Sequence, residues 1–139
     1  MGVPSVAAQP EESQIEHRVP FKVYYEDTDA LGIVYYANYF KFLERGRAEY
    51  LESGGRSVAD WNAAGYLFVV HAVSAKFKKP AALGDIIEIV TSFRHASPFR
   101  GVFDQRVERA GEVLLTATID IACLDSGQNL RRLPTSLTA

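Results

Sequence analysis

A single long helical segment, followed by runs with the composition of strands, constrains the fold of this chain most strongly. From Tyr36 onward, apolar and aromatic residues recur every three or four positions, which predicts an amphipathic helix of about 16 residues. The Ser-Gly-Gly sequence at residues 53–55 ends it, because glycine commonly closes helices. The predicted apolar face consists of Tyr36, Tyr39, Phe40, Leu43, Tyr50 and Leu51. A second, short helix is predicted over residues 58–64, with Ser57 as its N-cap.

The rest of the chain is rich in Val, Ile and Phe and predicts strands. One precedes the helix, within residues 16–25, and Pro20 inside it favours an edge position. Four more are predicted over residues 66–77, 85–94, 101–109 and 112–124, joined by hairpin-like turns. Strands grouped around one helix predict an α+β fold with an antiparallel sheet rather than a doubly wound parallel fold.

The composition excludes several classes of protein. A net charge of −2 gives no basic surface for nucleic acid, and no apolar run approaches the roughly 20 residues of a membrane span. The single cysteine, Cys123, rules out an intrachain disulfide framework and lies in an apolar run, so we predict a buried thiol. The first residues lack the pattern of a secretion signal, so we expect a cytoplasmic protein. We expect a disordered tail over residues 1–15, one domain over 16–134 and a C-terminal tail over 135–139.

The candidate site lies where the first strand meets the helix, in residues 23–38, VYYEDTDALGIVYYAN. Glu26, Asp27 and Asp29 are crowded there among tyrosines. Desolvation and mutual repulsion oppose the ionised forms of such carboxylates, which makes a purely structural turn a costly use of them. We therefore predict that one of them performs chemistry beside backbone amides of the helix that follows.

Other catalytic patterns are missing from the sequence. There is no Gly-x-Ser-x-Gly motif, and the three histidines, His17, His71 and His95, are scattered without a partner motif. There is no phosphate-binding glycine loop, and no Glu or His occurs with metal-ligand spacing. We therefore expect neither a metal nor another cofactor.

The segment VYYEDTDALGIVYYANYFKFLERGRAEYL resembles the signature of hotdog-fold acyl-CoA thioesterases, most closely the Tol–Pal-associated, YbgC-type branch beside the 4-hydroxybenzoyl-CoA thioesterases. The resemblance continues through FVVHAVSAKFKKPAALGDIIEI and the late motif RRLP, covering most of residues 18–134. It implies a five-stranded antiparallel sheet wrapped around a long central helix, and an acyl-CoA substrate. It also implies homodimers that join sheet edge to sheet edge, with sites at the interface, and often homotetramers.

Residue by residue, the resemblance makes Asp29 the catalytic carboxylate, acting as nucleophile on the thioester carbonyl or as the base that activates water. It assigns the backbone amide of Tyr36 to the thioester oxygen, and Gly32 would allow close approach of backbone and substrate. Many YbgC-type proteins carry His at the position of Tyr36, whereas 4-hydroxybenzoyl-CoA enzymes carry Tyr, so the acyl group stays open. Alternatively, Asp29 caps the helix or closes an Asx-turn. Glu44 on the helix is a second candidate for the catalytic carboxylate.

The remaining motif residues and the substrate contacts are assigned as follows. Asp27 is expected to cap the helix or to hydrogen-bond within the loop, Glu26 to lie on the surface, and the tyrosines to pack in the core. Coenzyme A carries three phosphate groups, so cationic residues are expected at the rim. Lys78 and Lys79 are candidates, and Arg94 with Ser97 fits the family's phosphate contact best. Further rim candidates are His95, Arg100, Arg131 and Arg132.

Three other functions remain open from the sequence. The chain could act on acyl-carrier protein, act on an aromatic CoA ester, or bind acyl-CoA without catalysis as a scaffold. A hotdog dehydratase is disfavoured, because those enzymes use a catalytic histidine and none lies in residues 23–38.

Overall fold

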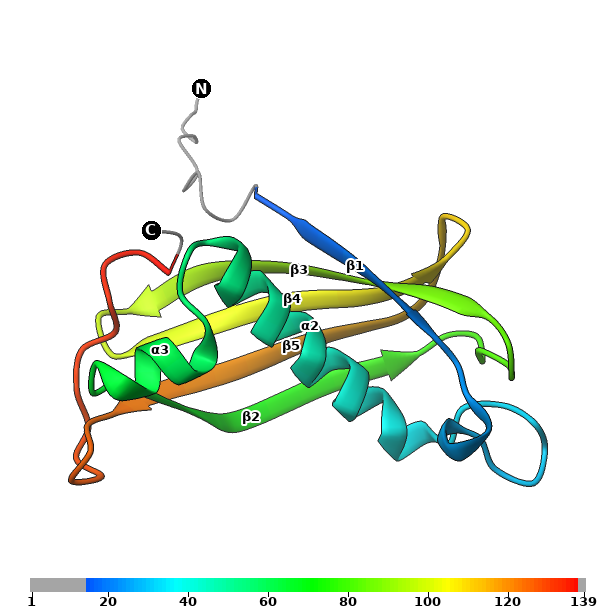
Figure 1. Ribbon diagram of the computed structural model, residues 1–139, viewed down its shortest axis with the longest axis horizontal. Helices are drawn as coiled ribbons and strands as arrows, with labels where there is room; N and C mark the ends of the chain where they lie inside the picture. The colour runs from blue at the N-terminus through cyan, green and yellow to red at the C-terminus, as the bar shows by residue number, and fades with distance from the viewer. Residues whose placement is uncertain (1–14, 138–139) are drawn as a thin grey trace.

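Five antiparallel strands form one curved sheet that wraps around helix α2 (Figure 1). The computed structural model describes residues 15–137. In chain order the elements are β1 (His17–Lys22), the 3-10 turns η2 (Tyr25–Asp27) and η3 (Tyr36–Asn38), α2 (Tyr39–Ser53), α3 (Val58–Ala63), β2 (Leu67–Phe77), β3 (Ile86–Ser97), β4 (Arg100–Arg109) and β5 (Glu112–Leu124). The strand order across the sheet is β1-β3-β4-β5-β2, so β1 and β2 are its edges. The predicted α+β hotdog architecture is confirmed.

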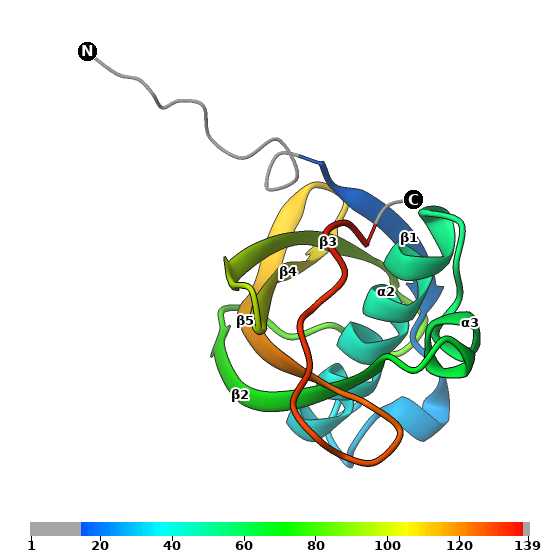
Figure 2. The same cartoon turned by 90° about the vertical axis from the view of Figure 1, so that its left-hand side faces the viewer.

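Helix α2 lies in the concave face of the sheet, as the end-on view of Figure 2 shows. Its buried residues are Tyr39, Phe42, Leu43, Gly46, Tyr50 and Leu51. Gly46 permits the close approach, because a Cβ atom there would lie 2.4 Å from Cγ2 of Ile89 on β3. Gln105 on β4 then ties helix to sheet, donating to the carbonyl of Leu43 (2.9 Å) and to Thr91 Oγ1 (3.0 Å).

The predicted apolar face of the helix was wrong at one end. Phe42, left out of it, is 2% exposed, whereas Phe40 is 37% exposed and Tyr36 60% exposed. The cause is the local geometry: residues 36–38 form a 3-10 turn, and the α-helix begins only at Tyr39. The buried face of the helix therefore begins at Tyr39, three residues later than predicted.

Most of the other predicted boundaries are close to those observed. Ser57 caps α3, accepting from the backbone amide of Asp60 at 3.1 Å, and the thiol of Cys123 is buried. Pro20 lies in an edge strand, as predicted. However, β1 ends at Lys22 and the chain then turns through η2, and β3 continues to Ser97, three residues past its predicted end.

The segment after β5 packs across one end of the sheet. Leu133 and Leu137 are buried in the core, so the packed domain extends past the predicted boundary at residue 134. Arg131 donates to the carbonyl of Gly65 (2.9 Å), and its guanidinium lies 3.8 Å from the centroid of the Tyr66 ring. Arg131 is therefore committed to a structural contact. The predicted disordered tail lies outside the described residues, apart from Ile15.

Candidate active site

The loop between β1 and α2 is closed by hydrogen bonds from its own residues. Asp27 Oδ2 accepts from the backbone amide of Tyr24 (2.8 Å), as expected for a loop hydrogen-bonder. The carbonyl of Asp27 accepts from the amide of Tyr35 and from Asn38 Nδ2, both at 3.0 Å. The start of the helix is thereby tied to the acidic turn. Glu26 is exposed, as expected for a surface residue.

Asp29 opens a tight turn, and its carboxylate is held by the backbone. Its Oδ1 accepts from the amide of Leu31 at 2.8 Å, which is an Asx-turn. Its carbonyl accepts from the amide of Gly32 at 3.0 Å, and its own amide donates to the carbonyl of Ile33 at 2.9 Å. The alternative Asx-turn is therefore formed, and it fixes one carboxylate oxygen while the side chain stays partly exposed.

Gly32 is required by backbone conformation. Its φ of +79° lies in the left-handed region that side chains rarely adopt, and a Cβ atom there would meet nothing within 4 Å. The turn at Asp29 therefore needs glycine because of its dihedral angle. Close approach to a substrate stays a prediction.

The helical run begins at Tyr36, four residues after Gly32 closes this turn. Tyr36 and Ala37 are the first residues of η3, which continues into α2, so their amides precede any intrahelical acceptor. Such a helix start carries a partial positive charge that favours an oxyanion. The side chains of Tyr35 and Tyr36 are largely exposed and only Tyr39 lies in the core, so predicting all three as core aromatics was wrong for two of them.

A mostly apolar hollow of about 310 Å³ lies beside these amides, lined by Ile33, Val34, Tyr36, Tyr39, Phe77, Lys78, Lys79 and Pro80. Asp29 does not itself line the hollow. The backbone amide of Asp29 donates to the carbonyl of Ile33, which is a lining residue, so Asp29 lies next to the hollow. The ring of Phe77 stands edge-on to Tyr36 (6.1 Å between centroids) and packs against Tyr39 (5.8 Å). The sequence did not identify Phe77, and its place at the end of a strand just before two lysines was the only signal.

The two lysines at the hollow differ in their contacts. Lys79 forms an ion pair with Glu112, and this hydrogen bond, followed by one from Arg109, lowers the pKa of Glu112. Lys78 is exposed, and within residues 15–137 no carboxylate pairs with it. Lys78 is therefore the lysine whose charge is available to an anion.

Arg94 and Ser97 lie far from Asp29 in the same chain. Strand β3 starts at Ile86, beside the loop, and at about 3.3 Å per residue its two ends are roughly 35 Å apart. Figure 1 shows the end of β3 and the loop before α2 at opposite ends of the molecule. Arg94 also forms an ion pair with Asp104 (2.8 Å), which raises the pKa of Arg94. One chain therefore gathers Asp29, Gly32, Tyr36, Lys78 and Lys79, without Arg94 and Ser97.

The other candidates lie elsewhere. Glu44 lines a hollow of about 220 Å³ between α2, α3 and β2, away from the helix start. His95 and Arg132 line another, of about 420 Å³, at the C-terminal segment. A further hollow, of about 500 Å³, covers the outer face of the sheet, where Asp104 and Glu16 are both paired with arginines. None of these three is lined by the first residues of the helical run.

Between residues 15 and 137, no group of three or more His, Cys, Asp or Glu side chains is arranged to hold a metal ion. No helix in this range has the length and hydropathy needed to cross a bilayer.

Comparison with known proteins decides the family. The model of the family described as "Thioesterase superfamily" matches residues 31–116, more than half of the chain. The chain belongs to the thioesterase superfamily. The acyl-CoA thioester hydrolase YbgC of Escherichia coli (strain CFT073) is 39% identical over 124 residues, covering 88% of this chain and 92% of that protein. The acyl-CoA thioesterase YbgC of Haemophilus influenzae is 36% identical over 110 residues, 78% of this chain and 81% of that protein.

Solved structures of the superfamily share the fold. A probable thioesterase from Bartonella henselae matches with a TM-score of 0.81 and 32% identity, covering 86% of this chain and 100% of that chain. The predicted identity as a hotdog-fold thioesterase of YbgC type is confirmed, and with it the assignment as an enzyme that hydrolyses thioesters.

Proposed function

We propose that this thioesterase hydrolyses an acyl-CoA, with Asp29 as nucleophile or general base and the Tyr36 amide polarising the thioester carbonyl. The observation that carries the proposal is the position of Asp29: its carboxylate is held by an Asx-turn seven residues before a helix start, next to an apolar hollow with a lysine at its mouth. The YbgC proteins of Escherichia coli and Haemophilus influenzae are named as an acyl-CoA thioester hydrolase and an acyl-CoA thioesterase, which supports the same substrate class here.

Two routes fit a single carboxylate. As a nucleophile, Asp29 attacks the carbonyl carbon, the C–S bond breaks, the CoA thiolate leaves, and water then hydrolyses the acyl-aspartyl anhydride. As a general base, Asp29 takes a proton from water, whose oxygen attacks the same carbon and expels the thiolate. In both routes negative charge develops on the carbonyl oxygen, which donors at the helix start stabilise.

The hollow has room for a small acyl group. A dry cavity of about 150 Å³ suffices for benzene, so about 310 Å³ has room for an aromatic ring or a short to medium chain. The test is thiol release over a panel of straight-chain and aryl CoA esters, with acyl-carrier-protein esters of the same acids in parallel. Hydrolysis of a CoA ester supports the proposal. Binding of CoA esters without release of thiol from any of them overturns it in favour of a scaffold.

Lys78 is the expected phosphate contact on this chain. Removing one exposed charge–phosphate contact costs on the order of 1 kcal/mol, so we expect Lys78→Ala to raise KM for CoA esters about fivefold and to leave kcat unchanged. Lys79→Ala is the matched control, since Glu112 already engages that charge. Steady-state kinetics at low salt measures both, and an equal effect of the two substitutions would contradict the assignment.

We further propose that two copies pair through β2. Within the described chain no strand pairs with the outer edge of β2, an 11-residue strand with half-exposed Val69, Val70, Val73 and Phe77. The other edge, β1, has six residues and is interrupted by Pro20 and charged side chains, which discourage pairing. An antiparallel pair would reverse the partner end for end, so Arg94 and Ser97 could serve a CoA chain only from the second copy. A homotetramer and a cytoplasmic location remain predictions.

The dimer predicts a solution mass twice the 15.4 kDa of the chain. Val73→Glu places a charge at this edge, so we expect a shift toward monomer in light scattering and a parallel loss of thiol release. Ile15→Glu, at a similarly exposed residue before the opposite edge strand, should change neither. A monomeric wild type, or a dimer untouched by Val73→Glu, would reject pairing through β2.

A further inference from the structure

The backbone of Ala81 is held on both sides at the base of the candidate active site. Its N–H donates to Tyr39 Oη at 3.0 Å, and its carbonyl accepts from the amide of Val34 at 2.9 Å. Ala81 is 0% exposed and Tyr39 4% exposed, so water does not replace this contact. Burial raises the pKa of the Tyr39 phenol, which therefore stays neutral.

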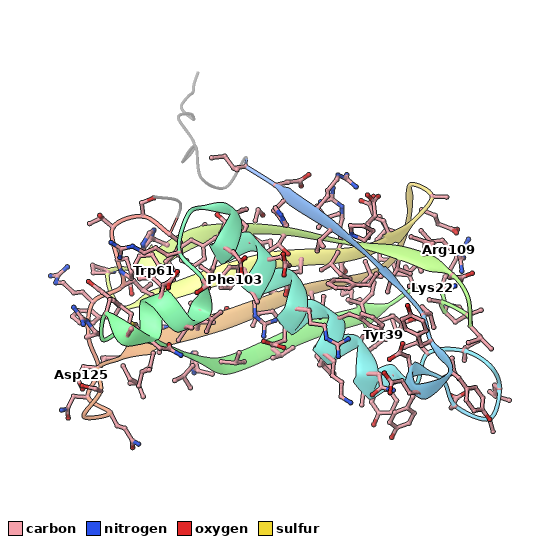
Figure 3. All side chains as sticks on the ribbon, viewed as in Figure 1. Lys22, Tyr39, Trp61, Phe103, Arg109 and Asp125 are labelled. Atoms are coloured by element: carbon pink, nitrogen blue, oxygen red, sulfur yellow. The ribbon has the colours of Figure 1, made fainter. Side chains whose placement is uncertain are left out.

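The loop that contains Ala81 is anchored to the sheet on its other side. Arg109, in β4, donates to Asp85 Oδ2 (2.8 Å) and to the carbonyl of Pro80 (3.2 Å). Asp85 Oδ2 also accepts from the amide of Ala82 (2.8 Å), and this bond, with that from Arg109, lowers the pKa of Asp85. Figure 3 shows Arg109 and Tyr39 at the same end of the molecule, at the start of α2. The 80–85 loop is therefore a fixed support.

The segment between Asp29 and Tyr36 rests on this support. Residue 33 bridges to Ala82, and the amide of Leu83 donates to the carbonyl of Gly32 at 3.0 Å. Tyr39 is the first residue of α2, so its hydroxyl joins the helix start to the support on which the Asp29 turn lies. The Tyr39 hydroxyl thus adds a buried hydrogen bond to the contacts of the Asp27 carbonyl that hold the carboxylate relative to the helix amides.

We propose that the Tyr39 hydroxyl is a positioning group, which sets the separation between the Asp29 carboxylate and the Tyr36 amide through the peptide of Ala81. The inference rests on the proposed function of these two groups. Tyr39 touches neither the reacting carbon nor the leaving sulfur. A displacement of about 1 Å in a catalytic group is enough to cost about 100-fold in rate, so a small movement of the helix start has a measurable effect.

Tyr39→Phe keeps the ring that packs on Phe77 and removes only the hydroxyl, leaving a buried N–H unpaired. We expect kcat to fall about tenfold, with KM nearly unchanged because the hollow and Lys78 remain. The matched control is Tyr50→Phe, a 2% exposed tyrosine near the other end of α2, which should keep kcat. Arg109→Gln loosens the same support from the surface and should lower kcat by a smaller factor.

A double-mutant comparison separates positioning from stability. Asp29→Asn removes the carboxylate, so its separation from the Tyr36 amide no longer affects the rate. In that background Tyr39→Phe should therefore cause almost no further loss of activity. If Tyr39→Phe and Arg109→Gln lower the melting temperature while kcat per folded molecule is retained, the positioning role is wrong and the thioesterase proposal stands. If the wild type releases no thiol, the proposed function itself fails.

Discussion

Asp29→Asn is expected to lower kcat for acyl-CoA hydrolysis by about 100-fold to 10,000-fold, the range for removing a positioned acid–base group. Asparagine retains an oxygen that accepts from the Leu31 amide, so the Asx-turn and the loop should survive. The reacting carbon would lose its nucleophile or base while the amides of the helix start remain. Thiol-release assays measure the effect, on variants whose circular dichroism spectra match that of the wild type.

The control for this prediction lies two residues earlier in the chain. Asp27 also accepts a backbone hydrogen bond through its carboxylate, and Asp27→Asn preserves an acceptor for Tyr24. We expect that variant to keep kcat within about threefold, a change below 1 kcal/mol of barrier. Equal losses in the two variants would indicate that the loop, rather than the chemistry of Asp29, had been damaged. Near-normal turnover in Asp29→Asn would remove the proposed mechanism.

Phe42→Ala is expected to cause the largest loss of stability, about 3–5 kcal/mol of unfolding free energy, because it opens a cavity at the centre of the core. Phe42 is 2% exposed and lies 5.9 Å from Phe21 between ring centroids. Phe40→Ala makes the same chemical change two residues earlier, where the ring is 37% exposed, so we expect a loss of about 1 kcal/mol. Urea denaturation of both variants at equal protein concentration gives the comparison. Similar losses would contradict the burial assignment.

The fold class, and the loop that holds the proposed site residues, could be predicted from the sequence because both depend on local pattern. Helical spacing after residue 36, β-branched runs and glycine stops are readable without tertiary contacts. The sequence order of Asp29, Gly32 and Tyr36 predicted where this loop lies, and the structure adds the positive φ of Gly32 and the Asx-turn. The acidic turn and the helix start are adjacent in sequence as well as in space.

Of the features that the sequence did not predict, one is local and the others depend on the tertiary structure. Phe40 and Phe42 have the same side chain, and only the later start of the α-helix decides which one enters the core. Phe77 and Ala81 join the site because the β2–β3 loop folds back over residues 32–34. The family motif predicts Arg94 at the site, but β3 is long enough to place Arg94 near the other end of the molecule.

The strand order also has a consequence for synthesis of the protein on the ribosome. The first strand made, β1, pairs with β3, with His17 opposite Thr91, and among the described strands β2 pairs only with β5, with Leu67 opposite Leu124. The exposed apolar strand β2 thus emerges about 50 residues before the last of its partner, and at roughly 5–20 residues per second that gap lasts seconds. During that interval β2 is an apolar strand without its sheet partner, and unpaired strand edges of this kind favour aggregation.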